Sequence, residues 1–329
     1  MTKHVIHFIL ALCLLALGVN LAERHLATVN RNMILGISFH EDYAAYLGLD
    51  PKETLNTILN DYGFKYIRLN ADWDKTEPAP NRFDFSHLDW QVNMAEAAGA
   101  KIVLAVGQKT PRWPECYAPD WAVALNDEQY FAALNNYVYT VVDRYRDNPA
   151  LEIYQVENEP FLAFGLKCRA LTKEQLQSEV GLARGTGKPV LVTDSGELST
   201  WRKTAQAADY FGTTLYRVVW NKYTGYWNYD WMPSSIYRFK LWMNGRTAAG
   251  SFVSELQAEP WLPDLDIKVV TKEEMARSMT VERLNRHIEV AQAIGVSRAY
   301  LWGAEWWVWM DKHGDASFGQ YIRKVVGGG

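Results

Sequence analysis

The sequence predicts an α/β protein, a single-domain (β/α)8 barrel of the TIM type. From residue 33 onward, short apolar runs rich in β-branched residues alternate with segments of helical pattern, and eight such units follow one another. Strict strand–helix alternation indicates a parallel sheet, and eight units are the number that closes a barrel. A length of 329 residues is enough for one such barrel.

The predicted strands are the apolar runs 33–39, 64–70, 101–106, 151–156, 189–193, 210–216, 250–254 and 298–303. The predicted helices between them cover 51–63, 86–100, 126–149, 172–185, 199–208, 234–245 and 271–295, and a short last helix follows the eighth strand. Local signals support several of them: Leu55, Ile58 and Leu59 recur at helical spacing, Asn126 suits an N-cap, and Thr271 with Glu274 forms a capping box.

An open, doubly wound sheet is the alternative arrangement of such units. That fold usually carries a glycine-rich phosphate loop after its first strand, and the sequence following residues 33–39 has none. The sequence contains no internal repeat and no interdomain linker, so the barrel is favoured.

Residues 1–27 have the layout of a secretory signal peptide. Lys3 and His4 precede an apolar run over residues 5–19, and the small residues Ala22 and Ala27 follow. The alternative is an uncleaved membrane anchor, although the run is short against the roughly 20 residues of a full span. We expect an exported protein, extracellular or periplasmic, with residues 28–329 forming the barrel; membrane attachment through residues 1–27 stays open.

The composition restricts the class of partner. The net charge is −4 and no cluster of Lys and Arg is present, which argues against a nucleic-acid partner. The histidines show no metal-ligand spacing, so we expect neither a metal nor another cofactor. Ten of the 14 tryptophans lie between residues 201 and 309, which is denser than core packing alone suggests.

Cys116 and Cys168 follow the predicted third and fourth strands, on neighbouring loops. In an oxidising compartment such a pair is a disulfide candidate, and the alternative is two free buried thiols.

Polar residues gather where the predicted strands end, at the barrel mouth. Glu159 follows the fourth strand and Glu255 the seventh. Two carboxyl groups facing each other can cleave a glycosidic bond, one as acid/base and the other as nucleophile. The pKa of the acid must then be raised by burial and by the neighbouring carboxylate. Tyr216 is placed to orient Glu255, and Asn158 to hold a sugar 2-hydroxyl.

The chain resembles the clan A glycoside hydrolases, a group of retaining (β/α)8 enzymes. The likeness rests on "NEP" at residues 158–160, on Glu255, Arg68, Tyr216 and Trp302, and on "WDKTEPAPNRFDFSHLDW" at residues 73–90. It implies that Glu159 is the acid/base, that Glu255 is the nucleophile, and that the substrate is an oligosaccharide or polysaccharide. No individual family fits well enough to name a sugar.

Two departures from that group stand out. Gln108 and Lys109 occupy a position where several of its families carry a His, and Glu259 competes with Glu255. Glu255 is preferred because it directly follows the apolar strand. The expected substrate-binding residues are Arg68, Trp73, Gln108, Lys109, Asn158, Tyr216, Glu259, Trp302 and Trp306.

Several alternatives remain open from the sequence. Arg68 can hold Glu255 or form a purely structural ion pair, and Glu157 is expected to support the site. The aromatic segments 223–231 and 305–310 either line sugar subsites or pack on each other. Lys109, Arg112 and Arg217 would suit a uronic acid, although a neutral sugar is favoured. A transglycosylase would use the same residues, and a carbohydrate-binding barrel would not need two carboxylates.

Overall fold

The computed structural model describes residues 29–166, 168–263 and 266–327. The predicted signal peptide or anchor, residues 1–27, lies outside this part of the chain. Among the described residues, no helix is long and apolar enough to cross a membrane.

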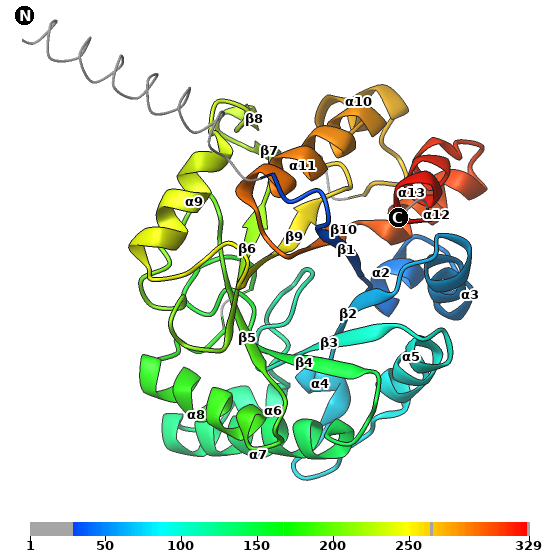
Figure 1. Ribbon diagram of the computed structural model, residues 1–329. Coiled ribbons are helices and arrows are strands. Elements are labelled where there is room, and N and C mark those ends of the chain that lie inside the picture. Colours follow the sequence, from blue (N-terminus) through cyan, green and yellow to red (C-terminus); the bar gives the residue numbers. More distant parts are fainter. Residues whose placement is uncertain (1–28, 167, 264–265, 328–329) are drawn as a thin grey trace, which may run out of the picture.

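Eight parallel strands close into a barrel in the order β1-β10-β9-β6-β5-β4-β3-β2, which confirms the predicted fold (Figure 1). The barrel strands are β1 (Ile34–Ser38), β2 (Tyr66–Asn70), β3 (Lys101–Val106), β4 (Leu151–Val156), β5 (Val190–Asp194), β6 (Tyr210–Leu215), β9 (Ser251–Gln257) and β10 (Arg298–Trp302). All eight coincide with a predicted strand, within a few residues at the ends.

Helices surround the barrel and bury the outer face of its strands (Figure 1). They are α2 (Glu41–Tyr46), α3 (Pro51–Asn56), the π-helix η1 (Thr57–Asp61), α4 (Trp73–Thr76), α5 (Ser86–Ala97), α6 (Asp120–Val123), α7 (Asp127–Tyr145), α8 (Lys173–Arg184), α9 (Ser234–Met243), α10 (Lys272–Ser278), α11 (Val281–Ile294), α12 (Ala304–Lys312) and α13 (Ser317–Gly327). Asn126 caps α7 through the capping box it forms with Gln129.

A separate apolar cluster fills the barrel below its mouth. It consists of Val103, Ile153, Leu191, Phe252 and Tyr300, one from each of five strands, and all are buried. The barrel interior is therefore a packed core, and the polar side chains near the strand ends lie directly above it.

Three elements differ from the prediction. The segment 199–208 forms turns in place of a helix, because Trp201 adopts a left-handed backbone (φ +66°) while its indole is buried and donates to the carbonyl of Ser195. The predicted helix 271–295 is two helices, α10 and α11, since Thr280 starts the second by capping the amide of Arg283. The tryptophan-rich segment after β6 contains an antiparallel hairpin of β7 (Val218–Asn221) and β8 (Gly225–Asn228), which the sequence did not reveal.

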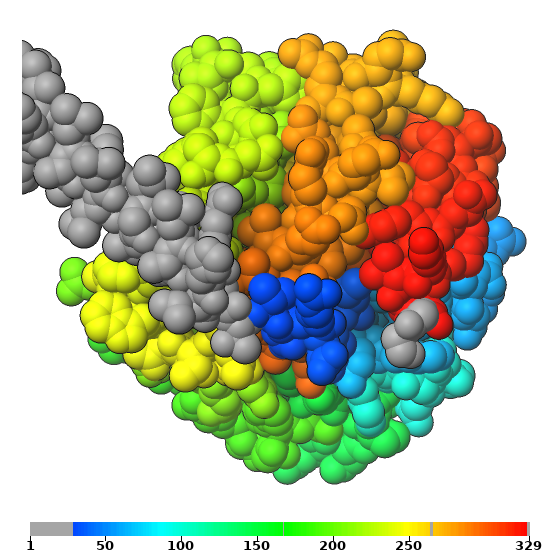
Figure 2. Space-filling model, turned by 45° about the horizontal axis from the view of Figure 1, so that its top comes forward, coloured from blue at the N-terminus to red at the C-terminus, as the bar shows by residue number. Residues whose placement is uncertain are grey.

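The first described residues lie against α11 (Figure 2). They directly precede Ile34, the first residue of β1, so they lie on the side of the barrel where the strands begin. The amide of Asn30 donates to the carbonyl of Gln292 at 3.0 Å, and its side chain donates to Val296 at 2.9 Å. The polar residues predicted for the site lie at the opposite ends of the strands.

Candidate active site

Glu159 and Glu255, called here the carboxylate pair, stand at the C-terminal ends of β4 and β9. Each is only 5% exposed. Glu255 Oε1 lies 3.0 Å from Nη1 of Arg68, and the hydroxyl of Tyr216 donates to Oε2 at 3.0 Å. Both oxygens of Glu255 are thus held by donors that favour an ionised carboxylate.

Glu159 has a contrasting environment. Among the described residues its carboxyl group makes no hydrogen bond, while its amide donates to Oγ1 of Thr193 at 3.1 Å. Burial, and next the negative charge of Glu255, raise the pKa of Glu159 well above its usual value. The two carboxyl groups therefore stand in contrasting environments, one bound by a cation and a hydroxyl and the other buried without a donor among the described residues.

Arg68 of β2 contacts residues at the ends of both β4 and β9. Its guanidinium is fully buried and donates to Gln155 Oε1, to the carbonyl of Ser254, to Glu255 Oε1 and to Asn158 Oδ1, at 2.7–3.2 Å. Asn158 Oδ1 also accepts from Thr193, so the amide oxygen is occupied. Among the described residues Asn158 Nδ2 donates to no group, which leaves it free to donate to a substrate hydroxyl.

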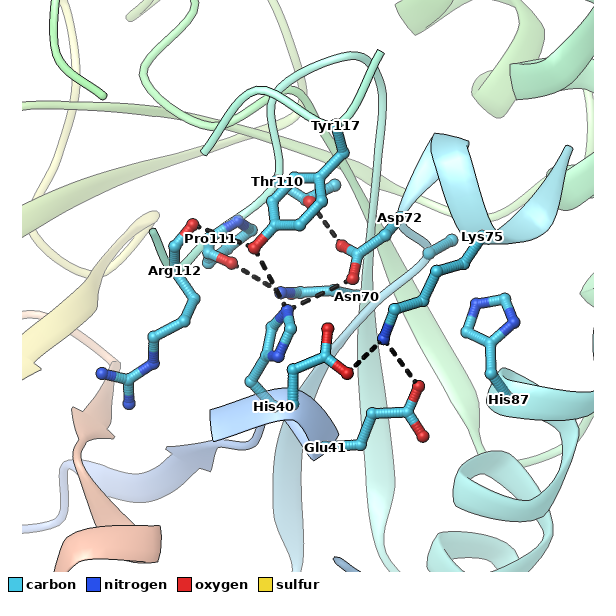
Figure 3. Close-up of polar contacts among 12 residues, drawn as sticks. His40, Glu41, Asn70, Asp72, Lys75, His87, Thr110, Pro111, Arg112 and Tyr117 are labelled. Carbon is cyan, nitrogen blue, oxygen red and sulfur yellow. Dashed lines mark hydrogen bonds and ion pairs between the residues drawn. The ribbon is translucent and has the colours of Figure 1, made fainter. Parts of the chain in front are cut away.

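The β3 loop (residues 107–117) closes one side of the mouth and folds back on itself through a bridge between Lys109 and Cys116. On one side it is bound to residues that directly follow β1 and β2 (Figure 3). Thr110 donates to Asp72 at 2.7 Å, His40 Nε2 lies 3.2 Å from the other oxygen of Asp72, and the hydroxyl of Tyr117 lies 3.3 Å from His40 Nε2. This buried network fixes the loop.

On the other flank the loop is attached to the residues after β4. Glu157 accepts the amides of Gln108 and Lys109 at 2.8 and 2.9 Å, which bears out its expected supporting role. Gly107 makes this approach feasible, because a Cβ there would lie 2.5 Å from the Glu157 carboxylate. Behind Glu157 lies Glu179 of α8, whose pKa burial and the Glu157 charge raise well above normal.

Cys116 and Cys168 form a disulfide between the β3 loop and the loop after β4. The amide of Leu166 also donates to the carbonyl of Pro114 at 2.9 Å. The loop that follows Glu159 and the β3 loop are therefore joined both covalently and by hydrogen bonds.

Arg112 reaches from the β3 loop across to β10. Its guanidinium is stacked between the rings of Tyr43 and Trp302, at 3.8 and 4.2 Å from their centroids. It is paired with Glu259 and lies 3.5 Å from Glu305. Trp302 thus keeps its predicted place at the mouth with one face covered by Arg112. Gly303 provides the room for Glu259, since a Cβ there would approach the Glu259 side chain to 2.3 Å.

Three expected substrate-binding residues are buried and engaged by other parts of the chain. Trp73 is fully buried under α7, stacked on Tyr137 at 5.4 Å. Trp306 is buried against Phe318 of α13. Gln108 is buried and its amide is engaged by Tyr130 and by the carbonyl of Arg169.

Lys109 is also buried, and its ammonium binds the carbonyls of Glu159 and Leu162, which makes it a structural element of the site. Of the two aromatic segments, Tyr223, Trp227 and Trp231 are exposed, while the tryptophans of α12 are buried.

The sequence missed two acidic residues near the pair, one buried and one half-buried. Glu115 of the β3 loop lies 3.6 Å from Lys109 Nζ, and burial raises its pKa to about 7. Glu197, after β5, accepts the amide of Tyr216 at 3.1 Å and so supports the residue that orients Glu255. Glu197 follows the apolar strand β5 as Glu159 follows β4, and this position was the signal that the sequence offered for both.

His40, Asp42 and Asp72 place one ligand atom each within 4.8 Å of one another, as a metal site would. The ammonium of Lys75 lies 2.6 Å from Asp42 and 3.0 Å from Glu41 (Figure 3). A cation is thus already supplied by the chain, and the residues do not fit a metal ion well.

Residues 53–175 match the family model of beta-galactosidase, glycoside hydrolase family 42. This stretch includes Arg68, Asn158 and Glu159 and ends before Glu255. Beta-galactosidase BgaH of Haloferax lucentense is 29% identical over 125 residues, which are 32% of this chain and 19% of that protein. The chain therefore spans about a fifth of the length of this relative.

Solved structures of glycoside hydrolases share the fold. A GH5_18 protein from Bifidobacterium longum subsp. infantis superposes with a TM-score of 0.64 at 14% identity, covering 90% of this chain and 79% of that one. Xylanase 10B of Thermotoga maritima gives 0.58 at 13% identity, covering 90% and 95%. The structures show the shared fold. Together with the sequence matches over part of the chain, they bear out the expected resemblance to the (β/α)8 glycoside hydrolases of clan A, and no individual family is assigned.

Proposed function

We propose that this protein is a retaining glycoside hydrolase that cleaves β-glycosidic bonds. The single observation that carries the proposal is the asymmetry of the carboxylate pair. Glu255 is bound by the Arg68 guanidinium and the Tyr216 hydroxyl, while burial and the charge of Glu255 raise the pKa of Glu159 well above its usual value. The sequence match to beta-galactosidases supports the proposal.

The chemistry takes two steps. Glu159 donates its proton to the glycosidic oxygen while Glu255 attacks the anomeric carbon, so the leaving alcohol departs and a glycosyl ester forms on Glu255. Glu159, now a carboxylate, takes a proton from water, which attacks the same carbon and releases Glu255. Asn158 Nδ2 donates to the sugar 2-hydroxyl during both steps.

The charges at the mouth favour a neutral sugar over a uronic acid. Each cation that suggested uronate binding already has an acidic neighbour: Arg112 has Glu259 and Glu305, and Lys109 has Glu115. Arg217 is buried, and its Nε lies 3.6 Å from Asp230. Binding a carboxylate here would require breaking one of these pairs, which costs several kcal/mol when the groups are buried.

The test is a product assay with residues 28–329 on β-linked glucans, mannans, galactans, xylans and uronic-acid polymers, with anomer analysis by NMR. We expect cleavage of a neutral substrate with retained configuration, and loss of turnover in Glu159→Gln and Glu255→Gln. Azide should restore a β-glycosyl azide product in Glu159→Ala and an α-glycosyl azide in Glu255→Ala.

Two other functions predict other results. A transglycosylase would transfer the glycosyl group to an added sugar acceptor in preference to water. A carbohydrate-binding barrel would retain glycan affinity in Glu159→Gln and show no turnover in the wild type.

We also propose export of the protein through residues 1–27, on the basis of the basic start and apolar run of that segment. Mass spectrometry of the protein from periplasm or medium tests this: a mature N-terminus near residue 28 indicates cleavage, an intact one in the membrane fraction indicates an anchor, and intact cytosolic protein contradicts export.

A further inference from the structure

Lys109 and Glu115 form an ion pair inside the mouth, and the steps above give it no role. Nζ of Lys109 lies 3.6 Å from Oε2 of Glu115, and their side chains are only 5% and 10% exposed. Removing two charges from water is expensive, so a buried pair of this kind contributes little net stability. Its position beside the carboxylate pair suggests a function there.

Lys109 holds the backbone on which Glu159 is mounted. Its ammonium donates to the carbonyls of Glu159 and Leu162 at 3.2 and 3.1 Å, and its own carbonyl accepts the amide of Asn158 at 2.8 Å. Glu159 itself adopts a left-handed backbone, with φ of +46°. An L-residue keeps this conformation only where its surroundings fix it, and Lys109 supplies two of the fixing contacts.

Glu115 is placed by its backbone and not by side-chain hydrogen bonds. Its φ is +66°, its amide donates to the carbonyl of Arg112 at 2.7 Å, and Cys116 beside it is in the disulfide. Gly165 packs against it, since a Cβ there would lie 3.0 Å from Cβ of Glu115. Its buried Oε2 meets no hydrogen-bond donor among the described residues, so Lys109 is its nearest counter-charge.

We propose that Lys109 and Glu115 are a positioning pair for the acid/base: Lys109 holds the Glu159 backbone, and Glu115 balances the ammonium charge beside it. This inference rests on the proposed role of Glu159. The charged and titratable groups that act on Glu159 are Glu255 of β9, Asp194 of β5, Tyr216 after β6, and the pair itself.

These charges determine the direction in which each substitution shifts the pKa of Glu159. Without Glu115, the ammonium of Lys109 stands uncompensated near Glu159, favours its ionised form and lowers its pKa. Without Lys109, the negative charges dominate and the pKa of Glu159 rises. The double variant removes both charges, and the two effects offset each other.

The experiment compares pH profiles of kcat/KM for the wild type, Glu115→Gln, Lys109→Met and the double variant, with Glu115→Asp as the charge-conserving control. We expect the basic limb to move down by about one pH unit in Glu115→Gln, to move up in Lys109→Met, and to return near the wild-type position in the double variant. Glu115→Asp should keep the limb in place.

If the pair had a purely structural role, its removal would lower kcat/KM at every pH and leave the basic limb of the pH profile in place. This result would overturn the inference. To separate it from the proposed function, the Glu159 carboxyl is titrated directly by 13C NMR, with its resonance assigned from Glu159→Gln. A shifted titration without glycosidase activity would leave the pair standing and refute the function; an unshifted titration refutes the pair. Glu115→Gln is nearly isosteric, so the test survives if Lys109→Met does not fold.

Discussion

Arg68→Met is expected to be one of the most damaging single substitutions in the barrel. The change keeps an unbranched apolar stem and removes a guanidinium that makes four buried hydrogen bonds, among them one to Glu255. Glu255 would remain buried and charged, with the Tyr216 hydroxyl as its remaining donor. Breaking a buried ion pair in this way costs about 3–5 kcal/mol. With an unfolding entropy of about 2.1 cal/mol/K per residue, a protein of this size then loses roughly 5–8 °C in Tm.

The loss should also depend on pH. The penalty is the cost of a buried carboxylate without its cation, and protonating the Glu255 carboxyl at low pH removes that charge, so the penalty shrinks as the pH falls. Arg68→Met should therefore be much less stable than the wild type at pH 8 and closer to it at pH 4. Thermal unfolding followed by circular dichroism at both pH values measures this difference.

Two variants serve as controls. Arg184→Met breaks the exposed pair with Asp209 and should cost less than about 1 kcal/mol. Arg68→Met combined with Glu255→Gln removes the unpaired charge and should recover part of the lost stability. A loss below about 1 kcal/mol in Arg68→Met, or strict additivity in the double variant, would refute the reasoning.

Three further changes have expected outcomes. Tyr216→Phe removes one charge-assisted hydrogen bond from Glu255, worth about 1.5–3 kcal/mol, and should slow turnover by up to roughly 10- to 150-fold in steady-state assays; because the bond is already present in the folded protein, the free energy of unfolding should also fall, by no more than that amount. Glu179→Gln should raise Tm at pH 8 and leave it unchanged at pH 4, because the raised pKa of Glu179 destabilises the fold only above the unfolded-state value; an equal effect at both pH values would contradict this. Cys116→Ala with Cys168→Ala opens a 52-residue separation and should lower the free energy of unfolding by about 4 kcal/mol in urea titrations.

The barrel and the carboxylate pair were predictable because their signals are local. Each strand is an apolar run bounded by turns, and in a parallel barrel every strand delivers its last residues to the same end. Glu159 and Glu255 could therefore be assigned to one site although 96 residues separate them in the sequence.

The prediction and the structure differ where packing between distant segments decides the outcome. Trp73 directly follows the mouth residues of β2, yet α4 turns its indole beneath α7, where Tyr130 and Tyr137 receive it. No pattern near Trp73 reveals these partners. The helix predicted for 199–208 failed for the same kind of reason, since burying Trp201 against Phe211 and Tyr237 takes precedence over local helix formation.

Glu115 was missed for a conformational reason. It lies in an irregular loop where Arg112 and Glu115 both have positive φ and the peptide before Pro114 is cis. Sequence periodicity says nothing about such a segment, so the direction of its side chains could not be derived.

The first described residues meet the barrel at the end where its strands begin, while the carboxylate pair stands where they finish. Whatever is joined to residue 29 is therefore attached at the end of the barrel opposite the carboxylate pair. A surface or support coupled there would leave the mouth facing outward. Immobilisation through the N-terminus should thus preserve access for long polymers.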